Sequence, residues 1–307
     1  MSKHKAMGSG IHLPVNQYTG TEGQSLVGLL STDLAVGAAA EGLLAKITQA
    51  VELIGGIGRT IKPGDSVLIK PNFNSPDPMP ASADVEFVAA VVALLRQAGV
   101  SELAVGESSG LPWHPTSCVL EQTGLLRRME QLDVPVIVFD DAEWVDVDLA
   151  ALGAKYLASV RVPAALDEYD KLVFLPNLKT HRLARFTMSL KLSVGLMHPD
   201  ERKALHAADL EEKTAELALA VRPDLIILDG RLAFVTLGPA KGELVSPGVI
   251  MTGGDQVSLD VEAIKILQGY QADNRLTGDA WSLPQIAAAA AHGIGPGAGR
   301  SYSVVRG

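Results

Sequence analysis

The stretch KLVFLPNLKTHRLARFTMSLKLSVGLMHPDERKALH, residues 171–206, combines a strand signal with a dense group of basic side chains. The apolar run at residues 172–175 predicts a short buried strand. Pro176 ends this strand, because proline has no backbone N–H to donate to a sheet. Four polar side chains follow within five positions: Asn177, Lys179, Thr180 and His181. A strand that stops at such a cluster is typical of a functional site.

The chain as a whole is acidic, whereas this stretch is basic. The 307 residues include 26 Lys and Arg against 35 Asp and Glu, which gives a net charge of −9. Residues 179–206 alone hold six Lys and Arg against two acidic residues. A net negative charge disfavours long-range attraction to nucleic acid or to an acidic membrane. A basic island in an acidic protein therefore predicts a small anionic ligand rather than a polymer.

Composition and cysteine content exclude several classes of protein. With 47% hydrophobic and 20% charged residues, the composition is that of an ordinary globular protein. Cys118 is the only cysteine, so neither an internal disulfide nor a cysteine-held iron–sulfur cluster is expected. No apolar run approaches the length of a membrane span, and residues 1–30 lack the core of a signal peptide. We therefore expect a cytoplasmic protein without a membrane partner.

Short apolar runs alternate with helical patterns along the chain. This alternation predicts an α/β fold, with a mostly parallel sheet flanked by helices on both faces. Residues 1–30 are rich in small and polar residues and predict a tail or an arm. Residues 31–307 then form one α/β domain, with a second lobe from about residue 230 as the alternative. A homo-oligomer is left open.

Polar side chains recur at the carboxyl ends of the predicted strands. In a mostly parallel sheet these ends meet at one edge, which is where ligands bind. The side chains expected there are Lys70, Asn72, Asn74, Glu107, Ser108, Ser109, Asp140, Asp141, Asn177, Lys179, His181, Asp229 and Asp255. The pattern predicts a crevice whose walls come from several strands.

The residue types in this crevice favour acid/base chemistry on an anion. His181 can exchange a proton near neutral pH or bind a metal. Lysine ammonium groups and asparagine amides bind carboxylates and phosphates. We therefore assign catalysis to His181, Glu107 and Asp229. Substrate binding is assigned to Lys70, Asn72, Asn74, Ser108, Ser109, Asn177, Lys179 and Lys191. If a divalent metal takes part, its candidate ligands are His181, His198 and Asp255.

Two other interpretations remain open for these residues. Lys179 and its neighbours could form a solvated basic loop with no ligand. The sequence GESSG at residues 106–110 matches the G-x-S-x-G pattern of serine hydrolases, with Ser108, Asp229 and His292 in a suitable chain order. However, Pro112 and Pro115 interrupt the helix that this pattern requires. His206 is a secondary candidate for the site.

Six segments of the sequence resemble the uncharacterised family called domain of unknown function 362. They are VLIKPNFN (67–74), AVGESSG (104–110), LVFLPNLKTH (172–181), MSLKLSVGLM (188–197), LIILDG (225–230) and GGDQVSLDVEAIKI (253–266). Many members carry a ferredoxin-like iron–sulfur module, for which this chain lacks the cysteines.

The family is in turn distantly similar to the lactate racemase fold. That resemblance implies that His181 is a proton or hydride partner and that Lys179 or Lys191 anchors an anion or a cofactor. The racemase motifs themselves are not reproduced in this sequence, so its nickel-pincer cofactor is not expected here.

From the sequence we expect an enzyme that acts on a small carboxylate or phosphate by acid/base or metal-assisted chemistry. The reaction itself, whether isomerase-like or oxidoreductase-like, is not assigned. The alternative is a non-catalytic protein that binds a metabolite or a metal. A serine hydrolase using Ser108 ranks below both.

Overall fold

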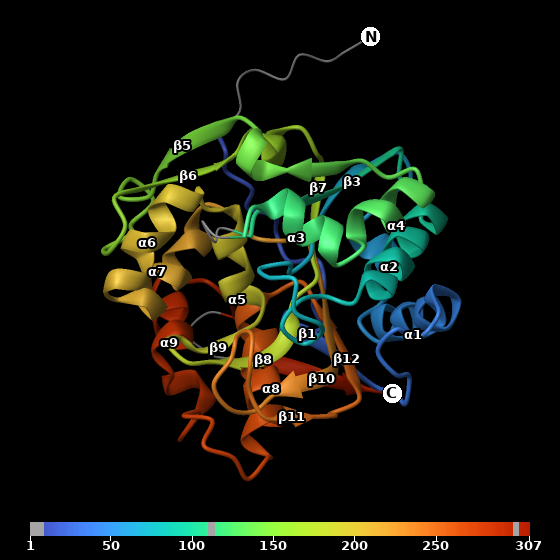
Figure 1. Cartoon of the computed structure of the whole chain (residues 1–307). Coiled ribbons are helices and arrows are strands. Elements are labelled where there is room, and N and C mark those ends of the chain that lie inside the picture. The colour runs from blue at the N-terminus through green and yellow to red at the C-terminus, as the bar shows by residue number, and fades with distance from the viewer. Residues whose placement is uncertain (1–8, 110–113, 297–300) are drawn as a thin grey trace.

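Eleven strands form one mostly parallel sheet at the centre of the protein (Figure 1). This is a computed structural model that describes residues 9–109, 114–296 and 301–307. Along the sheet the strands are β13 (Tyr302–Arg306), β1 (Ser25–Ser31), β12 (Val249–Gly253), β10 (Leu225–Phe234), β7 (Lys171–Phe174), β2 (Ser66–Lys70), β3 (Glu102–Glu107) and β4 (Val136–Val138). Added to this path are β8 (Asn177–His181), β9 (Arg185–Thr187) and β11 (Leu244–Val245). A separate antiparallel pair consists of β5 (Trp144–Asp148) and β6 (Ser159–Pro163).

Helices cover both faces of the sheet, as the sequence predicts. One face packs against α1 (Ala40–Glu52), α2 (Val85–Gln97), α3 (Thr116–Gln122) and α4 (Leu125–Gln131). The other face packs against α5 (Ser189–Leu192), α6 (Pro199–Ala207), α7 (Leu210–Glu216), α8 (Gln256–Gln268) and α9 (Pro284–Ala291). In Figure 1 the first group lies on the right and the second on the left and below. Short 3₁₀ turns lie at residues 57–59, 139–141, 164–167, 193–196, 217–219 and 280–282.

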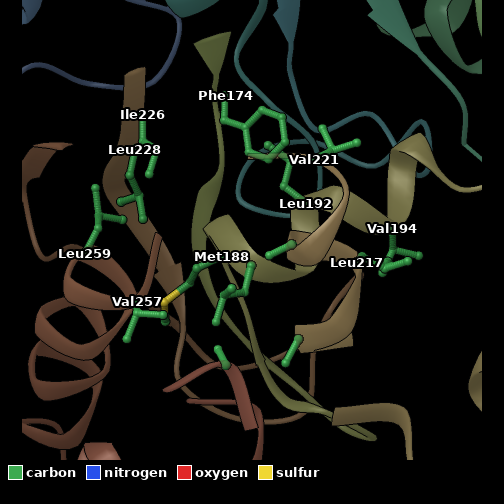
Figure 2. Close-up of a cluster of buried hydrophobic side chains, with 14 of the residues drawn as sticks. Phe174, Met188, Leu192, Val194, Leu217, Val221, Ile226, Leu228, Val257 and Leu259 are labelled. Carbon is green, nitrogen blue, oxygen red and sulfur yellow. The ribbon is translucent and has the colours of Figure 1, made fainter. Parts of the chain in front are cut away.

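The strand β7 shows how one apolar run serves two cores. Side chains alternate between the faces of a strand. Val173 accordingly belongs to the core under α1 and α2, whereas Leu172 and Phe174 belong to the core under α5–α9. Figure 2 shows Phe174 among Leu192, Met188 and Val257 in the second core. A strand buried on both sides needs a continuous apolar sequence, which explains why residues 172–175 show no alternation.

The predicted tail differs from the structure. Residues 25–31 form β1, which lies inside the sheet between β12 and β13. The preceding segment is also attached, because His12 pairs with Val221 in a β-bridge and its Nε2 lies 2.7 Å from a carboxylate oxygen of Asp224. The sequence does not predict these contacts, because this segment is rich in small and polar residues and few of its apolar side chains lie in the core.

The stretch after Pro176 also differs from a simple turn. Pro176 ends β7, but residues 177–181 form a second strand, β8. The strand β8 runs parallel to the second half of β10 and antiparallel to β9. The proline therefore separates two strands that both pair with β10, rather than ending the sheet at this point.

We predict that Phe174→Ala lowers the free energy of unfolding by about 3–5 kcal/mol, because it leaves a cavity in the core under α5–α9. Urea denaturation followed by circular dichroism measures the change. Leu183→Ala is the control: its side chain is 52% exposed, and the expected change is within about 0.5 kcal/mol. Equal losses in the two variants would contradict this account of the core.

Candidate functional site

The alternation of side chains along β8 gathers the polar residues on one side. Leu178 packs into the core under α5–α9, so the strand period directs Asn177, Lys179 and His181 to the opposite side. All three are buried, with exposed fractions of 2%, 2% and 7%. The interpretation of this stretch as a solvated basic loop is therefore wrong. Burial makes each of these polar groups depend on a partner within the protein.

Asn72, Asn177 and Lys179 hold the loop formed by residues 71–84. Asn72 donates to the carbonyl of Ala81 at 3.1 Å, and the Lys179 ammonium donates to the same oxygen at 2.6 Å. Asn177 donates to the carbonyl of Ser82 at 3.1 Å. These contacts hold the loop after β2 against β8. Asn74, in the same loop, is half-buried, and its side chain makes no hydrogen bond to another described residue.

Lys70 and Glu107 form a buried ion pair where β2 and β3 end. The ammonium of Lys70 donates to the Glu107 carboxylate and to the carbonyl of Pro71. That carboxylate also accepts the backbone N–H groups of Phe73 at 2.7 Å and Ser108 at 2.8 Å. Burial lowers the pKa of Lys70, and the charge of Glu107 opposes this shift. With these bonds in place, Glu107 anchors the ends of two strands.

Gly195 covers this ion pair at close range. A Cβ atom at this position would lie 2.6–2.7 Å from the end of the Lys70 side chain. Any side chain larger than hydrogen would therefore displace the lysine. The glycine of MSLKLSVGLM thus allows the segment after α5 to pack directly on the strand ends.

Ser108 lies in a polar network with Arg202 and Asp140. Its hydroxyl donates to the Asp140 carboxylate and accepts a hydrogen bond from Nη2 of Arg202 at 2.9 Å. The Thr116 hydroxyl donates to the same carboxylate at 2.6 Å and accepts the backbone N–H of Ser109 at 2.9 Å. Ser108 and Ser109 thus join β3 to α3 and α6.

The serine hydrolase interpretation fails on this geometry. His292 lies 3.3 Å from a carboxylate oxygen of Glu216, and Asp229 is bonded to Arg231. Neither residue contacts Ser108, whose hydroxyl is already bonded to Asp140 and Arg202. The triad of Ser108, Asp229 and His292 is therefore not assembled. Chain order alone could not reveal this.

Asp229 is tied to the start of α2 through Arg231. Arg231 donates to both oxygens of Asp229, at 2.9 and 2.7 Å, and to Asp84 at 2.8 Å. Asp84 in turn caps the start of α2 by accepting the N–H of Glu86. Burial raises the pKa of Asp229, while Arg231 opposes the shift. Because this carboxylate is held on both oxygens, its assignment as a catalytic acid or base is not supported.

Lys179, His181, Lys191 and His206 form the basic cluster of the site. Burial lowers the pKa values of Lys179, His181 and His206, and the charge of Lys191 adds to each shift, so the four side chains interact electrostatically. Burial is the largest cause of each shift. It lowers the pKa of Lys179 to about 7 and that of Lys191 to about 8.

The tautomer of His181 is set by the turn that follows β8. Its Nδ1 accepts the backbone N–H groups of Leu183 at 3.2 Å and Ala184 at 3.0 Å. Burial and the nearby cations lower the pKa of His181 to about 2, so the ring is neutral at pH 7. The proton of a neutral ring then lies on Nε2, which can donate a hydrogen bond but cannot bind a metal in this form. His181 is therefore suited to be a hydrogen-bond donor rather than a general base or a metal ligand.

Lys191 differs from the other buried lysines. Lys70 has Glu107, and Lys179 has the carbonyl of Ala81. The ammonium of Lys191 has no hydrogen bond or ion pair with any other residue that the structure describes, although the residue is only 8% exposed. A largely buried lysine without an acceptor from the protein is energetically unfavourable, which sets Lys191 apart within the basic cluster.

The helix α8 positions Lys191 by holding the start of α5. The Asp260 carboxylate accepts the backbone N–H groups of Ser189 and Leu190, both at 2.9 Å. The Gln256 amide donates to the carbonyl of Ser189 at 3.0 Å. Burial raises the pKa of Asp260 to about 7.

The three candidate metal ligands lie apart. His198 is at the start of α6, where its Nδ1 accepts the N–H of Asp200 and its ring packs on Trp144. Asp255 caps α8 at the opposite edge of the sheet from His181. Within residues 9–109, 114–296 and 301–307, no three His, Cys, Asp or Glu side chains are grouped so that they could hold a metal ion.

Sequence reasoning missed two residues that organise this site, Arg202 and Asp260. Asp260 lies in the family segment GGDQVSLDVEAIKI, in the interior of a helix on an apolar face. A carboxylate on the buried face of a helix is a signal that could have found it, because such groups are rarely buried without a partner. Arg202 carries no comparable signal, since it lies among other charged residues. Asp140 was expected at the strand ends, but its bonds to Ser108 and Thr116 were not.

The fold and the site together define an α/β protein with a buried basic cluster beside the strand ends. The chain belongs to the family described as domain of unknown function (DUF362), whose model matches residues 67–265. It is 31% identical over 236 residues to a thylakoid-associated protein of Synechocystis sp., and this match covers 74% of the chain and 70% of that relative.

The chain also has a weak likeness to a crystal structure of a protein from Thermotoga maritima. The TM-score is 0.43 and the sequence identity 12%, over 76% of this chain and 58% of the other. This chain thus spans a little over half the length of that protein.

Among the helices of the described residues, none is long and apolar enough to cross a membrane.

We predict that Arg231→Met lowers the free energy of unfolding by about 3–5 kcal/mol, because it leaves two buried carboxylates unpaired. Arg306→Met is the control: its side chain is 65% exposed, and its partner Glu262 keeps Lys265 and Tyr302 when Arg306 is removed, so the expected loss is at most about 1 kcal/mol. Urea denaturation measures both variants. A loss below about 1 kcal/mol for Arg231→Met would show that Asp229 and Asp84 do not depend on this arginine.

Asp260 gives a prediction for the pH dependence of stability. Its pKa is about 7 in the folded protein, against 3.8 for an ordinary aspartate, so between these values only the folded state keeps the proton. Stability from this group is therefore present below about pH 4 and is lost as pH rises to about 7, by up to about 1.4 kcal/mol per pH unit. Asp260→Asn should remove this slope, so the stability of the wild type relative to the variant should fall with pH. Asp146→Asn, at an exposed position, is the control. Parallel curves for wild type and Asp260→Asn in urea denaturation would refute the prediction.

Proposed function

We propose that the chain binds a small anion, a carboxylate or a phosphate, at the basic cluster, and that it is an enzyme acting on that anion. The observation that carries the proposal is the ammonium of Lys191, which makes no hydrogen bond or ion pair with a described residue although Lys191 is only 8% exposed. An anion placed there would supply the missing acceptor. Its charge would also offset the repulsion between Lys191 and Lys179.

The donors around this point suit an anion with two or more oxygens. Lys191 and Lys179 supply ammonium groups, and His181 supplies a neutral Nε2–H. A neutral imidazole donates a hydrogen bond without adding a third positive charge. It can therefore orient an oxygen of the anion without increasing the electrostatic repulsion between Lys179 and Lys191 when no anion is bound. Asn72 and Asn177 act indirectly, by holding the loop of residues 71–84 against Lys179.

Two lysines with lowered pKa values favour catalysis over simple binding. An amine that titrates near pH 7 to 8 can both give and accept a proton at neutral pH, which an ordinary lysine cannot. We therefore transfer the acid/base role from His181 to Lys179 or Lys191. The role of His181 becomes that of a donor to a substrate oxygen. The reaction class is left unassigned.

The proposal predicts that inorganic phosphate or a simple carboxylate such as lactate binds to the full chain. Lys191→Met should weaken binding at least about tenfold, because it removes the ammonium that lacks any other acceptor. Affinity should fall as pH rises from about 6 to about 9, since both lysines lose their charge over this range. Isothermal titration calorimetry measures both effects.

The matched control is Lys203→Met, which removes an exposed lysine from the same basic stretch. It should leave anion affinity unchanged. If Lys191→Met and Lys203→Met weaken binding alike, the effect is one of overall charge and the site is misplaced.

A separate measurement distinguishes an enzyme from a carrier. The full chain is incubated with a mixture of small carboxylates and phosphorylated metabolites in deuterated water, and the mixture is followed by NMR. Turnover or hydrogen exchange that is lost in Lys191→Met supports catalysis. An anion that binds through Lys191 and is released unchanged would establish a metabolite-binding protein instead.

The cellular location is also a proposal. We propose the cytoplasm, in keeping with the sequence composition. The name of the Synechocystis relative describes association with thylakoids, which makes attachment to a membrane surface the competing location. Cell fractionation with and without high salt distinguishes the two, because peripheral attachment through charge is released by salt.

A further inference from the structure

A cavity lies between the N-terminal segment and the turn before α8. Its volume is about 310 Å³, which is near the lower end of the range for small-molecule sites. Its walls come from the N-terminal segment, the start of β10 and the start of α8. The lining residues that matter below are Asn16, Arg222, Gly254, Asp255 and Gln256.

The strand register places this cavity far from the basic cluster. Gly253, which precedes the cavity residues, pairs with Ile226 near the start of β10. Lys179 of the basic cluster pairs with Phe234 at the end of the same strand. Eight residues of strand separate these positions, a span of about 26 Å. One side chain links the two regions, because Gln256 lines the cavity and its amide donates to the carbonyl of Ser189 at the start of α5, which carries Lys191.

Opposite charges line this cavity without forming an ion pair. The guanidinium of Arg222 has a buried Nε with no hydrogen-bond partner. Asp255 accepts the backbone N–H of Ser258 at 2.6 Å through one carboxylate oxygen. No ion pair joins Arg222 to Asp255 or to any other carboxylate in the described part of the chain. Burial lowers the pKa of Arg222 and raises that of Asp255, and the attraction between the two charges opposes both shifts.

Two further contacts shape the walls of the cavity. Gln256 borders it but is 2% exposed, and its amide donates to the carbonyl of Ser189. Gly254 lies directly against Asn16, since a Cβ at this position would be 2.2 Å from the Asn16 side chain. The N-terminal segment thus closes the cavity by packing on the turn before α8.

The charges select the class of ligand. A simple anion would pair with Arg222 but would be repelled by Asp255. A simple cation would pair with Asp255 but would be repelled by Arg222. A molecule that carries both charges on a short frame satisfies the two side chains at once. We propose that this cavity binds a zwitterion of the α-amino acid class, with the carboxylate on Arg222 and the ammonium on Asp255.

The experiment measures binding of single amino acids to the full chain by isothermal titration calorimetry. At least one should bind with a dissociation constant of about 1 mM or lower. Arg222→Gln and Asp255→Asn should each weaken that binding at least about tenfold. Asp255→Asn keeps an oxygen that can cap Ser258, so α8 is preserved while the charge is removed. Arg222→Lys is the second variant at that position if Arg222→Gln proves unstable.

Two controls separate this site from the basic cluster. Lys191→Met should leave amino acid binding unchanged, and Asp255→Asn should leave phosphate binding unchanged. The proposal is overturned if no amino acid binds to the wild type, or if acetate and propionate bind as tightly as the amino acid. Loss of amino acid binding in Lys191→Met would likewise overturn it, by locating the ligand at the basic cluster.

Discussion

The burial of the polar side of β8 is the constraint on which the rest of the site depends. Asn177, Lys179 and His181 are removed from water by the loop after β2 and by the segment that follows β9. Each buried polar group needs a hydrogen-bond partner, because burying an unpaired one raises the free energy of the folded state by more than a single hydrogen bond lowers it. Backbone carbonyls satisfy Asn177 and Lys179, and backbone N–H groups satisfy Nδ1 of His181. Lys191 differs from these residues, because its ammonium has no hydrogen bond or ion pair with a described residue.

The segments that resemble the family supply the residues that make these contacts. LIKPNFN supplies Lys70 and Asn72, AVGESSG supplies Glu107, and the glycine of MSLKLSVGLM makes room for the ion pair between Lys70 and Glu107. GGDQVSLD supplies Gln256 and Asp260, which hold the short helix that carries Lys191. Several of these residues therefore act on the backbone of their neighbours. A motif can mark a site without each of its polar residues touching the ligand.

The sequence is a good guide to what forms strands and a poorer guide to what the polar groups do. Continuous apolar runs such as residues 172–175 predict buried parallel strands, and the sheet with helices on both faces is confirmed. The strand β8 escapes prediction because Pro176 is a strong stop signal, although the alternation of Asn177, Leu178, Lys179, Thr180 and His181 is itself a strand pattern. The roles of Asp229 and His292 are not predictable, because their partners Arg231 and Glu216 are a matter of three-dimensional placement. The tautomer of a histidine cannot be predicted from sequence either. His181 was expected to exchange a proton near neutral pH, but in the structure its Nδ1 accepts two backbone N–H groups.

The pairing of β1 with β13 has a consequence for contacts between copies of the protein. The strand β13 pairs with the side of β1 that faces away from β12. Without β13, this side of β1 would present a row of unpaired backbone groups to other chains. We therefore expect a variant that lacks residues 302–306 to aggregate more readily than the protein with β13 in place.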